Sequence, residues 1–67
     1  MNRLAENYAS SLRSEAEQLE KLADEIEATA KQYGQVACFK PYVEKSRHQA
    51  SELRELIERM YSDPVFH

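Results

Sequence analysis

The sequence contains only one cysteine, one glycine and two prolines, and it has no tryptophan. A single cysteine cannot pair within its own chain, so the protein is not a disulfide-stabilised miniprotein. Long apolar runs are also missing, because the longest, Val36-Ala37-Cys38-Phe39, covers four residues. A run of this length predicts no membrane-spanning helix. Residues 1–6 lack the apolar stretch of a secretory signal, and we therefore expect a cytoplasmic protein.

What remains is the composition of a small helical protein. The chain has 67 residues, which is enough for one domain and too few for two independent cores. Apolar residues make up 42% and charged residues 31%, with a formal net charge of −3. We therefore expect residues 1–67 to form a single all-α helical-hairpin domain.

A long first helix is predicted over about residues 3–33. Residues 2–32 contain neither glycine nor proline and consist mainly of strong helix formers. Apolar side chains recur with a seven-residue spacing in two rows that keep a helical period. The rows are Ala5, Leu12, Leu19, Ile26 and Tyr33, and Ala9, Ala16, Ala23 and Ala30. Asn2 is expected to cap the start of the helix, and Lys31 with Gly34 marks its end.

A shorter second helix is predicted over about residues 41–61, after a connecting turn of residues 35–40. Pro41 suits the first turn of a helix, because its missing N–H has no partner there in any case. Apolar positions again form two rows with a seven-residue spacing. The rows are Val43, Ala50 and Ile57, and Ser46, Leu53 and Met60. Residues 62–67 are expected to form a C-terminal tail, because the residue before Pro64 resists the helical conformation.

The two predicted helices are expected to pack as an antiparallel hairpin. A turn at residues 35–40 would set Ala23 opposite Leu53 and Ala16 opposite Met60, so that small side chains meet large ones. The second helix would be about ten residues shorter than the first, and the tail would fold back over the exposed start of the first helix. The same seam could also form between two chains if the connection straightened, which leaves a closed and a helix-swapped form open.

Beside the seam lies a second set of apolar residues, which predicts a contact with another chain. The expected partner-binding residues are Tyr8, Leu22, Tyr42, Leu56 and Tyr61. A two-helix monomer of this size seldom stabilises itself, because chain entropy nearly cancels the free energy of burial. We therefore expect a homodimer that forms a four-helix bundle, and docking on a different protein partner remains the open alternative.

Residues that could carry out chemistry are sparse. His48 stands four residues from both Glu44 and Glu52, and we interpret this stripe as solvent-exposed because the metal-binding helix motifs are absent. Cys38 has no activating base beside it, and we interpret it as a half-buried thiol at the end of the hairpin. The sequence also has no glycine-rich phosphate loop. We therefore expect no enzymatic activity, no cofactor, no bound metal and no small-molecule ligand.

The sequence thus predicts a non-enzymatic protein–protein interaction module, such as an adaptor, a co-chaperone or an inhibitor. The alternative is a homodimeric four-helix bundle that binds RNA or DNA through Arg47 and Arg54 of both chains. Glutamates alternate with the basic residues of the second helix, however, and phosphate binding needs a concentrated basic surface. Nucleic acid is therefore not the expected partner. A spacer coiled coil with no ligand of its own is a third interpretation.

Overall fold

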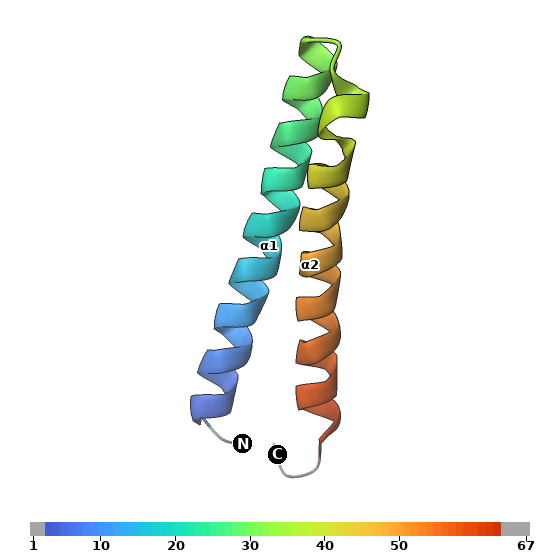
Figure 1. The fold of residues 1–67 in the computed structure, drawn as a ribbon. Helices are drawn as coiled ribbons and strands as arrows, with labels where there is room; N and C mark the ends of the chain where they lie inside the picture. Colours follow the sequence, from blue (N-terminus) through green and yellow to red (C-terminus); the bar gives the residue numbers. More distant parts are fainter. Residues whose placement is uncertain (1–2, 64–67) are drawn as a thin grey trace.

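The computed structural model describes residues 3–63 and contains two helices that pack against each other (Figure 1). Helix α1 spans Arg3–Gln32 and helix α2 spans Val36–Ser62. They run antiparallel, so that the start of α1 and the end of α2 lie at the same end of the molecule. No strand occurs within residues 3–63, and the prediction of an all-α fold with two helices is confirmed.

The end of α1 is closed by a left-handed glycine. Gly34 has a φ of 67°, a conformation that only glycine adopts without strain. Its N–H donates to the carbonyl of Lys31 at 3.2 Å, and the N–H of Gln35 donates to the carbonyl of Ala30 at 2.8 Å. This pair of hydrogen bonds is the Schellman motif, which satisfies carbonyl groups that the helix end would otherwise leave unpaired. The predicted roles of Gly34 and Lys31 at the end of the first helix are confirmed.

The start predicted for the second helix was wrong. Helix α2 begins at Val36, so the connection consists of residues 33–35 and not of residues 35–40. Pro41 lies inside the helix, where its missing N–H leaves the carbonyl of Ala37 without a helical donor. Both residues are exposed, so water can bind this carbonyl and the proline is tolerated.

The C-terminal end of α2 lies close to the residue predicted from the sequence. The helix ends at Ser62, and Asp63 adopts an extended conformation with φ −77° and ψ 120°. This is the conformation that a residue before proline prefers. Residues 64–67 lie outside the described residues, as does Asn2, so the predicted tail and N-terminal cap belong to parts of the chain that the structure does not describe.

The seam between the helices is built on the predicted alanine row. Ala9, Ala16, Ala23 and Ala30 are between 0% and 2% exposed. On α2 the buried residues are Val43, Ser46, Ala50, Ile57 and Met60, which confirms most of the two predicted rows. No large side chain within residues 3–63 is completely buried, so the core is thin.

Larger side chains fill the seam toward the chain ends. There Leu12, Ile57 and Met60 form a cluster with Ala9, and Leu53 and Tyr61 pack against it. In the view of Figure 1 the two ribbons diverge toward this end. The expectation that the first turns of the long helix form an uncovered overhang is wrong for Leu12, which is buried in this cluster.

The register between the helices also differs from the prediction. A turn centred in residues 35–40 would place Arg47 level with Thr29 and Arg54 level with Leu22. Instead, the connection of residues 33–35 is centred on Gly34, and the core cluster sets Leu12 beside Ile57. Arg47 and Arg54 therefore start farther from the turn and reach back toward it to bind Glu27 and Glu20. The shift follows from the turn, because a shorter connection that starts earlier brings each residue of α2 level with an earlier residue of α1.

Within residues 3–63, neither helix combines the length and the apolar character that crossing a membrane requires.

Candidate protein-interaction surface

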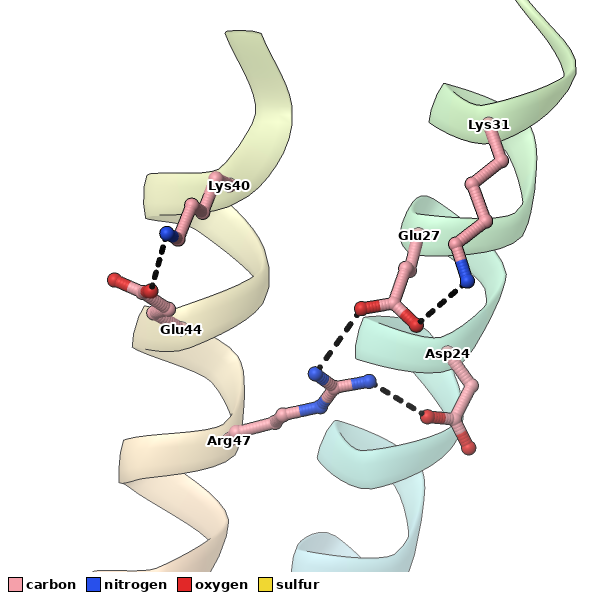
Figure 2. Close-up of polar contacts among 6 residues, drawn as sticks. All are labelled: Asp24, Glu27, Lys31, Lys40, Glu44 and Arg47. Atoms are coloured by element: carbon pink, nitrogen blue, oxygen red, sulfur yellow. Dashed lines mark hydrogen bonds and ion pairs between the residues drawn. The ribbon is translucent and has the colours of Figure 1, made fainter. Parts of the chain in front are cut away.

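One side of the hairpin carries ion pairs between the helices, and we call this side the charged flank (Glu20, Asp24, Glu27, Arg47 and Arg54). The Arg47 guanidinium extends from α2 and donates to the carboxylates of Glu27 and Asp24, each at 3.2 Å (Figure 2). Farther from the turn, Arg54 Nε donates to Glu20 at 3.0 Å, and a second guanidinium N–H binds the other carboxylate oxygen. The Arg54–Glu20 pair is therefore bidentate, a geometry that only arginine provides.

Further ion pairs lie within single helices on this part of the molecule. Lys31 Nζ lies 3.7 Å from Glu27, as its four-residue spacing predicts, and Lys40 Nζ lies 3.9 Å from Glu44 (Figure 2). Glu27 thus contacts two cations, one from each helix. Exposed pairs of this kind contribute little individually to stability.

The charged flank makes the hairpin sensitive to acid. The hydrogen bond from Arg54 lowers the pKa of Glu20 below its ordinary value of 4.5, and the hydrogen bond from Arg47 does the same for Glu27. A carboxylate whose pKa is lower in the folded state stabilises that state above its unfolded pKa, and this stabilisation is lost as the pH falls through the folded value.

We therefore expect the urea midpoint of unfolding to fall between about pH 5 and pH 3, and to fall less in an Arg54→Gln variant. Circular dichroism at a series of pH values measures this difference. Lys21→Gln is the matched control, because Lys21 forms no ion pair within residues 3–63 and its loss removes the same charge. Equal acid sensitivity in wild type and Arg54→Gln would contradict the role assigned to Arg54.

The same ion pairs bear on the nucleic-acid alternative. Both arginines that this alternative needs, Arg47 and Arg54, are bound to carboxylates of α1. A guanidinium held by a carboxylate has to break that pair before it binds a phosphate. The charged flank is therefore a neutralised surface rather than a basic patch, which weighs against RNA or DNA as the ligand.

The opposite side of the hairpin carries a group of large apolar side chains among polar ones, and we call this group the apolar flank (Leu19, Leu22, Ile26, Phe39, Leu53 and Leu56). Three shallow hollows follow one another along it. The first is lined by Leu22, Ile26 and Phe39. The second is lined by Leu19, Leu53 and Leu56, together with the polar residues Gln49, Glu52, Glu55 and Arg59. Since a third hollow joins Leu19 to Leu22, the three form one continuous surface across both helices.

The apolar flank exposes large side chains. Leu22 is 46% exposed, Phe39 is 37% exposed and Leu56 is 36% exposed. Between them, Leu19, Ile26 and Leu53 are half-buried. Single exposed leucines are common on soluble proteins, whereas a contiguous row across two helices is typical of an interaction site.

The structure brings together some of the five residues predicted to bind a partner. Leu22 and Leu56 lie on the apolar flank. Tyr42 is exposed and its ring lies 6.4 Å from that of Phe39, at the turn end of the same flank. Tyr8 is also exposed, and it precedes Leu22 by two steps of seven residues, which places both on one side of α1. Tyr61 differs, because it is half-buried against the core cluster at the far end.

Sequence reasoning missed Phe39 as a surface residue because it assigned residues 35–40 to a turn. A signal was present: Phe39 precedes Ser46 by seven residues and so extends the row of Ser46, Leu53 and Met60. Val36 extends the row of Val43 in the same way. Both rows pass Pro41 without a change of phase, which indicates a helix that continues through the proline.

Groups that could support chemistry are exposed and isolated. Cys38 is exposed on α2, so the interpretation of a half-buried thiol was wrong; the early start of the helix turns it to solvent. His48 lies 2.9 Å from Glu52, and both side chains are exposed. No cluster of three or more potential metal ligands is found within residues 3–63.

The chain matches no protein-family model, no curated protein sequence and no solved structure.

Proposed function

We propose that this chain is a small non-enzymatic protein–protein interaction module, acting as an adaptor, a co-chaperone or an inhibitor. It presents the apolar flank to a larger protein partner or to a second copy of itself, with which it forms a four-helix bundle. The observation that carries this proposal is the continuous exposure of Leu22, Phe39 and Leu56 across both helices.

The thin core supports the same conclusion. The hairpin seam consists largely of alanines, which bury little apolar area per residue. The larger side chains of the apolar flank remain partly in water, although covering them would add stability that the seam does not supply. A partner that covers this flank therefore stabilises the fold at the same time as it binds.

We expect Leu56→Glu to abolish association while leaving the helix content nearly unchanged, because a charge on this flank cannot be buried in an apolar contact. The measurement is light scattering behind a size-exclusion column, over a range of concentrations and with reductant to keep Cys38 from forming disulfides. If wild type is monomeric, the same variants serve as immobilised bait for a different protein. Ala28→Glu is the matched control, because it adds the same charge at an exposed position of α1 away from the apolar flank.

The proposal is supported if wild type and Ala28→Glu associate, with themselves or with another protein, and Leu56→Glu does not. It is contradicted if Leu56→Glu associates as strongly as wild type. It is equally contradicted if wild type is monomeric and every protein that it retains is also retained by Leu56→Glu.

A further inference from the structure

We infer that residues 36–40, the first turn of α2, form a lid that opens at Pro41 while the rest of the hairpin stays folded. In the closed state, which the structure shows, the lid extends α2 back to Val36. In the open state α2 begins at Pro41, and the turn end of the apolar flank is uncovered. This inference concerns a movement of the chain itself and does not depend on what the apolar flank binds.

The lid contributes no residue to the buried seam. Ala30 of α1 and Val43 of α2 are buried, and every residue from 31 through 42 is exposed. In proteins most of the stability of a helix comes from the packing of its apolar face, so the lid receives little of it. Segments with few buried apolar contacts open at a lower free energy than the core.

The contacts between the lid and α1 are apolar and partly wet. Phe39 and Val36 line two hollows that share Ala30 of α1. Phe39 is 37% exposed and Val36 is 44% exposed. Within residues 3–63, no side-chain hydrogen bond or ion pair joins the lid to α1. The ion pair of Lys40 is with Glu44, on α2 itself (Figure 2).

Pro41 also weakens the attachment of the lid to the rest of α2. Because proline has no N–H, the carbonyl of Ala37 has no helical donor. At the start of the helix, Gln35 makes no side-chain capping hydrogen bond. The Schellman motif at Gly34 lies before the lid, so the chain still reverses there when the lid opens.

Two local preferences of the chain are satisfied only in the open state. Lys40 is helical in the closed state, although a residue before proline prefers an extended conformation. Pro41 suits the first position of a helix, where its missing N–H has no cost. Opening therefore loses the contacts of Val36 and Phe39 with α1 and relieves the conflict at the proline.

Opening changes the surface that the chain presents. Phe39 leaves the hollow that it shares with Leu22 and Ile26. Ala30, which is 2% exposed in the closed state, loses the two lid side chains beside it. The lid therefore controls how much apolar surface of α1 is accessible at the turn end of the apolar flank.

Amide hydrogen exchange followed by NMR tests the lid in the full chain. Opening releases the helical acceptors of four amides, those of residues 39, 40, 42 and 43, whereas the amide of Glu44 keeps its acceptor on Lys40. We expect these four amides to share one protection factor, at least about 100-fold lower than that of Leu53 in the seam. The protection factor should then rise in a single step at Glu44.

Two variants and a control test the cause of the opening. Pro41→Ala supplies a donor for the carbonyl of Ala37, and the four amides that remain the same should exchange at least about tenfold more slowly than in wild type. Phe39→Ala removes an apolar contact of the lid, and the amide of Lys40 should exchange at least about threefold faster. Ser51→Ala is the control at an exposed position of α2 beyond the lid, where the exchange of the lid amides should not change.

Four results would overturn the lid. A gradual rise in protection from Phe39 onward, without a step at Glu44, would indicate ordinary fraying of a helix end. Lid amides as protected as that of Leu53 would open only with the whole hairpin. Lid amides in wild type that exchange as fast as those of an unstructured peptide would show that the closed state is not populated. Unchanged exchange in Pro41→Ala would show that the proline does not cause the opening.

Discussion

Replacing Ile57 with alanine is expected to lower the free energy of unfolding by about 2–4 kcal/mol. Ile57 is 7% exposed and forms the cluster at the chain ends with Ala9, Leu12 and Met60. Truncation removes most of the apolar side chain and leaves a space that the two helices cannot fill without moving together. Because the hairpin has a thin core, a loss of this size is a large part of its total stability.

Urea unfolding followed by circular dichroism measures this effect. Ile57→Val removes a single methylene, and a loss of about 0.5–1.5 kcal/mol is expected for it. Val36→Ala is the control at an exposed position of the same helix, for which the change should stay within about 0.5 kcal/mol. An Ile57→Ala variant as stable as Val36→Ala would show that the cluster does not hold the chain ends together.

Replacing Ala23 with leucine is expected to lower the free energy of unfolding by about 1–3 kcal/mol, although leucine is an excellent helix former. Ala23 is 0% exposed in the middle of the seam. A larger side chain there would force the helices apart and would also strain the ion pairs on the charged flank, which depend on the spacing of the two helices.

The matched control is Ala28→Leu, which makes the same substitution at an exposed position of α1. Here the unfolding midpoint should hardly change, because nothing packs against the new side chain. If both leucine variants unfold at the same urea concentration, the close approach of the helices along the alanine row is refuted.

The fold class could be predicted because the relevant signal lies within each helix. The seven-residue rows of apolar residues identify the buried side of α1 before any partner helix is known, and Ala9, Ala16, Ala23 and Ala30 are all buried as that spacing requires. Gly34 likewise marks the end of α1, because its left-handed conformation is a local property of the backbone.

The start of α2 was mispredicted because one local preference was given too much weight. Pro41 favours the first turn of a helix, but it does not require that position. The Schellman motif at Gly34 reverses the chain at once, and Val36 and Phe39 then extend the two rows of α2 toward the turn. The carbonyl that Pro41 leaves without a helical donor is exposed to water, so the helix continues through the proline.

The prediction of the candidate site also depended in part on where α2 begins. Leu22 and Leu56 were predicted from their positions beside the seam and lie on the apolar flank. Phe39 was missed because a residue in a turn has no fixed side, whereas a residue in a helix does. Tyr61 was assigned to the same surface, yet it packs against the core cluster, because the altered register brings the end of α2 beside Leu12.

The sequence by itself determined two amphipathic helices and the side that each one buries, because the spacing of apolar residues along a helix depends on the chain alone. Only the tertiary structure decided which residues of the two helices lie level. That choice placed Arg47 and Arg54 against α1 carboxylates and left the apolar flank on the opposite side. The physical reason is that the level between helices is set by the length of the turn and by contacts across the seam, which join residues far apart in the sequence.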